Sequence, residues 1–113
     1  MELKELLEFV DWESDRIEGL HGAKTDRERK LWAATKVSEE LGELNSEVLA
    51  SLGLQRPHKV EKYTHEHLSE EVIDVILTAL LLAKTFEVDV EDALEKKMRK
   101  LEQRIYTNAI EGK

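Results

Sequence analysis

An acidic side chain interrupts the most apolar segment of this chain. The segment SEEVIDVILTALLLA spans residues 69–83, and Asp74 stands in it between Ile73 and Val75, three residues after Glu71. Burying an unpaired charge costs several kcal/mol, whereas a domain of this size has only about 5–15 kcal/mol of total stability. The fold must therefore pair Asp74 with a cation or leave it facing a cleft.

The rest of the chain has the composition of a helical protein. Pro occurs once and Gly five times in 113 residues, while the abundant Leu, Glu, Lys and Ala are strong helix formers. Charged residues make up 37% of the chain and hydrophobic residues 41%, which is typical of globular rather than disordered proteins. No strand-like alternation or internal repeat is evident. We expect a single all-α domain over residues 1–113.

Apolar spacing and capping residues predict four helices in the sequence. They are expected at residues 2–18, 26–52, 65–86 and 90–109. Thr25 and Glu28 have the spacing of a capping box at the start of the second helix. Thr64 and Asp89 are candidate caps for the third and fourth helices. The segment around Pro57, the single proline, is expected to be a linker.

Composition also excludes several classes of protein. The absence of Cys rules out disulfides and thiolate metal sites. The N-terminal sequence has no signal-peptide pattern, and the apolar run 72–83 is too short for a bilayer, which needs roughly 20 apolar residues. We therefore expect a cytoplasmic protein without membrane contact. A net charge of −8 argues against binding nucleic-acid polymers, but a small phosphorylated ligand is compatible if a cation mediates the contact.

Polar side chains form strips on three of the predicted helices when residues are placed at 100° intervals. The strip on the second helix is mainly acidic and contains Lys36, Glu40, Glu43 and Glu47. The strip on the third helix contains His67, Glu71, Asp74 and Thr78. The strip on the fourth helix is basic and contains Lys97, Lys100, Arg104 and Asn108.

Two interpretations of the acidic strips are open. The strip on the second helix could be a solvated face, and Asp74 could form a buried salt bridge with Lys97 or Arg104. Alternatively, carboxylates one turn apart on two antiparallel helices converge on metal ions, as in other helical bundles. All-oxygen ligation without Cys suits Mg²⁺, with Mn²⁺ as a substitute.

Two segments resemble the MazG-like all-α nucleoside triphosphate pyrophosphatases. They are KVSEELGELNSEV at residues 36–48 and LSEEVIDVILTALLLAKTFEVDVEDALEKKMRKLEQR at residues 68–104. The family's signature is E-x-x-E on one helix and E-x-x-D on the next. The matching residues here are Glu40, Glu43, Glu71 and Asp74. The resemblance covers the chain from about residue 27 to residue 106.

The resemblance implies a four-helix bundle-like protomer that assembles through its helices into a dimer or tetramer. It implies hydrolysis of (deoxy)nucleoside triphosphates to the monophosphate and pyrophosphate, which clears non-standard or surplus nucleotides. The four matching carboxylates would bind Mg²⁺, and Glu40 or Glu43 would position or deprotonate the attacking water. Lys97 and Arg104 would bind phosphate, and Lys36 is a further candidate for that role.

Other residues and functions stay open. Trp12, Trp32 and Tyr106 could stack on a base, although packing in a core or interface is the alternative for each. Glu47 could reach a second metal or remain solvated. Some members of the family carry an Asn where Leu101 stands, so base and sugar specificity does not carry over. The competing functions are a phosphoribosyl-ATP-type pyrophosphohydrolase and a non-catalytic acidic helical module that binds other molecules.

Overall fold

The chain is built from helices joined by short connections. A computed structural model describes residues 1–22 and 24–110, with the backbone alone for residues 105–110. The helices are α1 (Leu3–His21), α2 (Asp26–Ser51), α3 (Pro57–Lys62), α4 (His65–Thr85) and α5 (Val90–Ile110). The described residues contain no strand, so the predicted all-α class is confirmed. Within the same residues, no helix is long and apolar enough to cross a membrane.

The predicted caps begin three of the long helices. At the start of α2, the hydroxyl of Thr25 accepts a hydrogen bond from the amide of Glu28 at 3.1 Å. The carboxylate of Glu28 accepts one in return from the amide of Thr25 at 3.2 Å, which completes the capping box. Thr64 caps α4 by accepting from the amide of His67 at 3.1 Å, and the Asp89 carboxylate caps α5.

Helices α2 and α4 end in the same way, with one residue in the left-handed region. Gly53 has φ 71° after α2, and the next amide bonds the carbonyl of Leu49 at 2.8 Å. Glu87 has φ 53° after α4, and the next amide bonds the carbonyl of Ala83 at 3.0 Å. These bonds satisfy carbonyl groups that the last helical turn leaves free.

Two boundaries differ from those expected. α1 continues through Gly19 to His21 and ends at Gly22, whose φ is 78°. The expected linker contains the short helix α3, with Pro57 at its start, a position where proline's missing N–H costs nothing. Both differences are local, and neither moves the long helices that carry the acidic strips.

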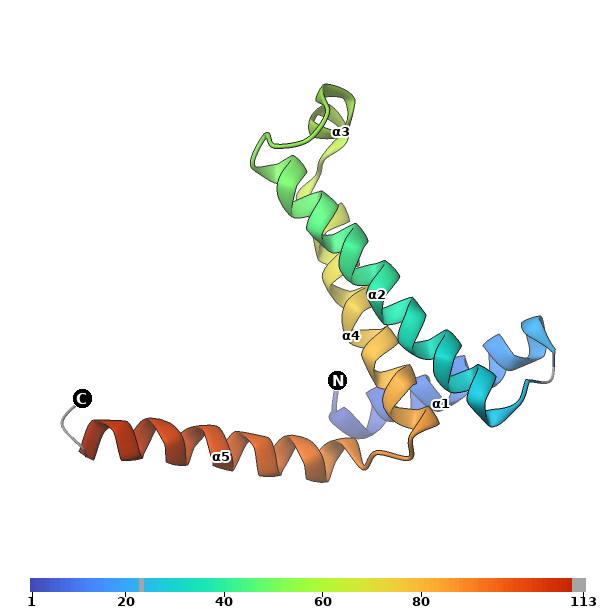
Figure 1. The fold of residues 1–113 in the computed structure, drawn as a ribbon, viewed down its shortest axis with the longest axis vertical. Coiled ribbons are helices and arrows are strands. Elements are labelled where there is room, and N and C mark those ends of the chain that lie inside the picture. The colour runs from blue at the N-terminus through green and yellow to red at the C-terminus, as the bar shows by residue number, and fades with distance from the viewer. Residues whose placement is uncertain (23, 111–113) are drawn as a thin grey trace.

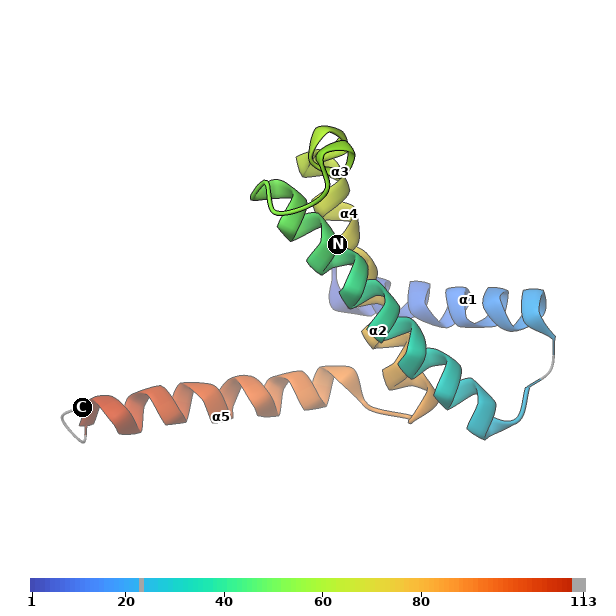
Figure 2. The ribbon, with the colours of Figure 1, turned by 45° about the horizontal axis from the view of Figure 1, so that its top comes forward.

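The central feature of the fold is an antiparallel pair formed by α2 and α4 (Figure 1). The short helix α3 lies where the chain turns from one to the other. α1 crosses the opposite end of the pair and packs on α4 (Figure 2). An ion pair of 2.8 Å between Lys84 Nζ and Asp11 Oδ1 joins α4 to α1 at this crossing.

Helix α5 extends away from the other helices (Figure 1). It has no extended packing contact with them in the described part of the chain, and residues 91–104 are all exposed. The radius of gyration is 18.1 Å, against about 13 Å for a compact domain of this length. The described residues of one chain therefore do not close the expected four-helix bundle, because the apolar side of α5 has no extended packing contact among them.

The core of a single chain is small. Among the described residues, the buried hydrophobic side chains are Val10, Ala33 and Ala50, with 3%, 2% and 4% of their surfaces exposed. Many large apolar side chains are exposed, including Phe86 at the end of α4 and Met98 on α5. Several larger apolar side chains, such as Leu44 and Leu81, are only partly buried, so one chain gains less from apolar burial than a fully packed core would.

The α2–α4 pair has two unlike faces. One carries the acidic residues and is the face that α1 crosses. The other has exposed apolar side chains, and we call it the apolar face, formed by Leu41, Val48, Val72 and Ile76. Ile76 lies about 140° around α4 from Glu71 at 100° per residue. In an antiparallel pair of helices, side chains at the same rotation from the acidic residues lie on the same side of the pair. The exposed apolar side chains of α2 and α4 therefore form one surface.

Candidate functional site

Three carboxylates from two helices meet on the face of the α2–α4 pair that α1 crosses. Glu40 and Glu43 come from α2, and Glu71 comes from α4. One oxygen of each carboxylate lies within 4.8 Å of the others. The i, i+3 spacing places the first two on the same side of α2, and the antiparallel packing of α4 brings the third opposite them. We call these three residues the acidic cluster.

Asp74 lies beside the acidic cluster, one turn after Glu71 on α4. It is outside the group of three oxygens, but its negative charge raises the pKa values of Glu40 and Glu71. Asp74 forms no ion pair with any described residue. The salt bridge with Lys97 or Arg104, one of the two interpretations of the sequence, is therefore not formed within the chain.

Several carboxylate oxygens of the site are buried without a hydrogen-bond partner. They are Oε2 of Glu40, Oε2 of Glu47 and Oε2 of Glu71. A buried acceptor without a donor costs free energy, and the cost is larger when the group is charged. A hard cation with oxygen ligands, such as Mg²⁺, would satisfy these atoms. The oxygen donors thus fit the expected metal, although Glu43 is exposed and Glu40, Glu47 and Glu71 are only half-buried as whole residues.

Burial and mutual repulsion raise the pKa values of two members of the cluster. The pKa of Glu40 is raised first by burial and then by the charges of Glu43 and Asp74. The pKa of Glu71 is raised by burial and by the charges of Glu43, Asp74 and Glu40. Without a cation, the folded chain therefore holds protons at these positions more tightly than an exposed glutamate does.

Lys36 is the positively charged residue of α2 that lies beside the acidic cluster. Its ammonium group bonds the carboxylate of Glu39 at 2.8 Å, and this bond is the main cause of its raised pKa. The nearby charges of Glu40 and Glu43 raise the same pKa further. Lys36 Nζ also lies 5.8 Å from the centre of the Trp32 ring. Lys36 is thus at the edge of the acidic cluster, where a phosphate would need a counter-charge.

The other predicted phosphate ligands lie elsewhere in the chain. Lys97 and Arg104 are exposed on α5, which extends away from the α2–α4 pair (Figure 1). A single chain does not bring these two side chains to the acidic cluster. In the described part of the chain, α5 meets the other helices near its first residue, where Val90 lines a pocket with Leu7 of α1 and Leu80 of α4.

A hollow adjoins the acidic cluster where α1 crosses α2 and α4. Its volume is about 310 Å³, and side chains from all three helices line it. Its polar and aromatic lining includes Phe9, Glu13, Trp32, Glu40, Asp74 and Thr78. The cavity is therefore lined both by carboxylates that could hold a metal, Glu40 and Asp74, and by the large aromatic ring of Trp32.

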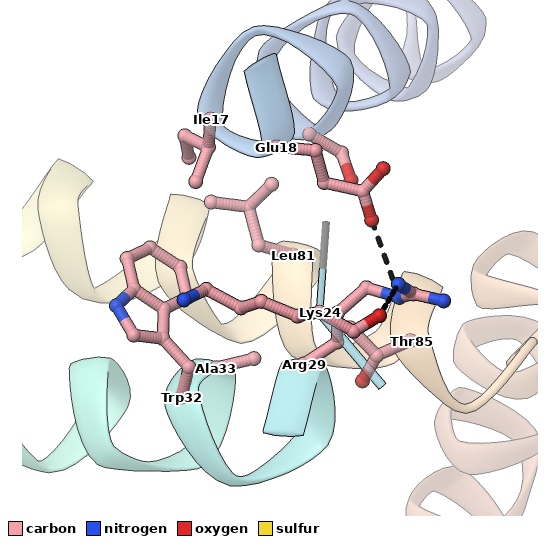
Figure 3. Close-up of a pocket in the computed structure, with 9 residues that line it drawn as sticks. Ile17, Glu18, Lys24, Arg29, Trp32, Ala33, Leu81 and Thr85 are labelled. Atoms are coloured by element: carbon pink, nitrogen blue, oxygen red, sulfur yellow. Dashed lines mark hydrogen bonds and ion pairs between the residues drawn. The ribbon is translucent and has the colours of Figure 1, made fainter. Parts of the chain in front are cut away.

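Trp32 also lines a smaller cavity of about 40 Å³, which Figure 3 shows in close-up. Ile17 of α1 and Leu81 of α4 line the same smaller cavity. An ion pair of 3.3 Å between Arg29 Nε and Glu18 Oε1 joins α2 to α1 at its edge. The indole is therefore held between α1 and α4 rather than free in solvent.

Of the other predicted aromatic candidates, Trp12 is not among the residues that line this hollow. Trp12 lies on α1 with 57% of its surface exposed and packs near the ring of Phe9. The side chain of Tyr106 falls outside the described residues.

Two residues of the hollow, Phe9 and Glu13, were not expected from the sequence. They line the hollow only because α1 crosses the α2–α4 pair at this point. Their i, i+4 spacing with Ile17 places all three on one side of α1, which is the only signal the sequence carried.

Comparisons with protein-family models, with curated proteins and with solved structures found no match to this chain.

Proposed function

We propose that this chain is a Mg²⁺-dependent nucleoside triphosphate pyrophosphohydrolase of the MazG-like kind. The observation that carries the proposal is the acidic cluster, with three carboxylate oxygens within 4.8 Å of one another and an adjoining hollow lined by Trp32. The substrate would be a (deoxy)nucleoside triphosphate, and the products would be the monophosphate and pyrophosphate. The E-x-x-E and E-x-x-D spacing of Glu40, Glu43, Glu71 and Asp74 supports the same proposal.

The metal would be held by the acidic cluster together with Asp74. Carboxylate oxygens are the ligands that Mg²⁺ prefers, and Mn²⁺ accepts the same set. When bound, the ion would neutralise phosphate charge and offset the charge that develops at the α-phosphorus. It would also relieve the repulsion among these side chains, which burial intensifies.

The protein's own groups would orient the reactants. Glu40 or Glu43 would accept a proton from the attacking water as its oxygen bonds the α-phosphorus. The bond from that phosphorus to the bridging oxygen would break, and pyrophosphate would leave. Lys36 would contact phosphate oxygens from the edge of the cluster. Trp32 would bound the space for the base.

The functional form would be a homo-oligomer, either a dimer or a dimer of dimers. The apolar face has large exposed side chains on both α2 and α4, and one chain buries very little core. A second copy is the occupant that would supply equal apolar area in return. Packing of a second copy against Leu94, Met98 and α5 as a whole would complete the bundle. It would also set the direction of the basic residues Lys97 and Arg104.

Pyrophosphate release is the direct test of this function. The full chain is incubated with a panel of ribo- and deoxyribonucleoside triphosphates, with Mg²⁺ or with chelator. We expect the monophosphate and pyrophosphate in equal amounts, and only when Mg²⁺ is present. If no nucleotide is hydrolysed under these conditions, the chain is better described as a non-catalytic acidic module.

Asp74→Asn tests the site assignment. We expect this variant to keep its helical content and to lose at least about a hundredfold in kcat/KM, because a neutral amide is a poor ligand for Mg²⁺. Glu70→Gln is the matched control, since Glu70 is exposed on the same helix and should leave turnover unchanged. Normal hydrolysis by Asp74→Asn would show that this carboxylate is structural.

A further inference from the structure

Three side chains with hydrogen-bond donors meet where α3 packs on the end of α2 (Figure 2). The hydroxyl oxygen of Ser46, on α2, accepts a hydrogen bond from Gln55 Nε2 at 3.0 Å. The same oxygen lies 3.5 Å from Nζ of Lys59, on α3. All three residues are half-buried. We call these three residues the donor group.

The donor group has hydrogens that the described chain does not use. An ammonium carries three hydrogens, an amide two and a hydroxyl one. Ser46 Oγ accepts from both neighbours, and its own hydrogen is not donated to any described residue. Lys59 forms no ion pair with a described residue. Its contact of 3.5 Å with the hydroxyl is longer than an ordinary hydrogen bond of about 3.0 Å. Donors therefore remain for an acceptor from outside the chain.

The donor group lies next to the acidic cluster along α2. Ser46 follows Glu43 by three residues, and residues at this spacing are neighbours on the surface of a helix. At 1.5 Å per residue, Ser46 lies about 4.5 Å beyond Glu43 and about 21 Å beyond Trp32 along the helix axis. The order along α2 is therefore the hollow with Trp32, then the acidic cluster, then the donor group.

A phosphate chain matches this order of groups. Phosphate oxygens are ligands of Mg²⁺, which the acidic cluster would hold, and they accept hydrogen bonds from ammonium, hydroxyl and amide groups. If the base lies in the hollow and the α-phosphorus at the metal, the β- and γ-phosphates extend towards the donor group. The charges of Glu43 and Glu47 would repel these phosphates in the absence of a cation. Binding at the donor group should therefore require Mg²⁺.

We propose that Ser46, Gln55 and Lys59 bind the terminal phosphates of the substrate and the pyrophosphate that leaves from it, so that nucleoside triphosphates are preferred to diphosphates. The ammonium of Lys59 would offset the charge of the departing group. This role falls to α3 rather than to the basic residues of α5, which a single chain does not bring to the cluster. The inference rests on the proposed function for the direction of the nucleotide along α2.

Calorimetric titration with pyrophosphate in excess Mg²⁺ tests the donor group without any turnover. We expect Lys59→Gln to weaken the binding of pyrophosphate at least about tenfold, since hydrogen bonds to charged groups contribute that much. Lys62→Gln is the matched control, because Lys62 is exposed on the same helix, and it should bind pyrophosphate as the unaltered chain does. AMP, whose single phosphate would lie at the metal, should bind equally to all three proteins. Circular dichroism checks that each variant keeps its helical content.

The ratio of kcat/KM for a nucleoside triphosphate to that for its diphosphate tests the same group during hydrolysis. Lys59→Gln should bring this ratio towards one, because the diphosphate lacks the phosphate that reaches furthest along α2. Ser46→Ala removes the oxygen that Gln55 and Lys59 contact, and we expect the same direction of change. Lys62→Gln should keep the ratio of the unaltered chain.

The two measurements separate this inference from the proposed function. Pyrophosphate binding that is weaker in Lys59→Gln, without hydrolysis of any triphosphate, would support the donor group and refute the pyrophosphohydrolase. Hydrolysis with the same pyrophosphate affinity and the same ratio in the unaltered chain, Lys59→Gln and Ser46→Ala would refute the donor group alone. An equal loss of affinity in Lys59→Gln and Lys62→Gln would indicate general attraction by a basic helix, and would also refute it. So would the absence of pyrophosphate binding to the unaltered chain.

Discussion

At the scale of single residues, the site holds charges that this chain does not neutralise by itself. Glu40, Glu43 and Glu71 meet with Asp74 beside them, and the nearby Lys36 is already bonded to Glu39. Repulsion and burial raise the pKa values of Glu40 and Glu71. Such an arrangement lowers the stability of the folded state at neutral pH unless a cation binds. The same unfavourable energy would favour the binding of a divalent ion.

The raised pKa of Glu40 predicts a pH dependence of stability. A carboxyl whose pKa is raised by folding binds its proton more tightly in the folded state. Its contribution to the free energy of unfolding is present at low pH and is lost as the pH rises through the raised pKa. Glu40→Gln should therefore become more stable relative to the unaltered chain as the pH rises from about 4.5 to about 7.5. The quantity that increases is the free energy of unfolding of the variant minus that of the unaltered chain.

Chemical denaturation in chelator, at one protein concentration, measures this difference. Glu70→Gln is the control, because that exposed carboxylate lies outside the cluster, and its difference from the unaltered chain should change less with pH. Addition of Mg²⁺ at the higher pH should stabilise the unaltered chain more than Glu40→Gln. Parallel pH curves for the unaltered chain and Glu40→Gln would contradict the electrostatic account of the cluster.

At the scale of elements, the two helices that build the site are well defined at both ends. α2 begins with the capping box of Thr25 and Glu28 and ends at Gly53. α4 begins at Thr64 and ends with Glu87 in the left-handed region, which costs a residue with a side chain some strain. These ends fix where each helix begins and ends, while the packing of α2 on α4 brings Glu71 opposite the glutamates of α2.

The capping box predicts the cost of removing one side chain. Thr25→Ala leaves the amide of Glu28 without its acceptor at the start of α2, and we expect a loss of about 1 kcal/mol in the free energy of unfolding. Thr35→Ala is the matched control, since Thr35 is exposed within the same helix and alanine is the better helix former. Urea denaturation of both variants measures the difference. An equal effect of the two substitutions would mean that the cap contributes nothing.

At the scale of the whole molecule, one chain is open, with a radius of gyration of 18.1 Å where a compact domain of its length has about 13 Å. The buried side chains are the small ones of Val10, Ala33 and Ala50, and the described residues of α5 make no extended contact with other helices. A helix of this length with an unpartnered apolar side is marginal in water, since tertiary packing supplies most of the stability of helices in proteins. The apolar face and α5 are the two surfaces that remain to be covered.

Self-association through the apolar face predicts the effect of a charge placed on it. Ile76 is 45% exposed in the single chain, so Ile76→Glu would cost little in a monomer. In an oligomer it would bury a carboxylate and weaken association at least about tenfold. Leu20→Glu is the control, because Leu20 is 67% exposed near the end of α1, away from that face.

Light scattering after size-exclusion chromatography, over a range of protein concentrations, distinguishes the two variants. We expect an oligomer for the unaltered chain and for Leu20→Glu, with a lower mass for Ile76→Glu. The thermal midpoint of the unaltered chain should also rise with its concentration. A monomeric mass for the unaltered chain at every concentration would contradict association through this face.

The sequence by itself determined the four long helices and the strips of side chains along them. Thr25, Thr64 and Asp89 act on amides within three residues of themselves, so their roles follow from local spacing. The same is true of Glu40 and Glu43, which share one side of α2 because they are three residues apart. Such interactions need no knowledge of what packs against the helix.

Only the tertiary structure decided what those strips meet. The crossing of α1 brings Phe9 and Glu13 to a hollow that Asp74 also lines. Asp74 is more than fifty positions away from both in the sequence. The basic strip of α5 was expected beside the acidic ones, yet α5 extends away from them. Packing between distant segments depends on the total apolar surface that each arrangement buries. That sum is not visible in the spacing of residues along any one helix.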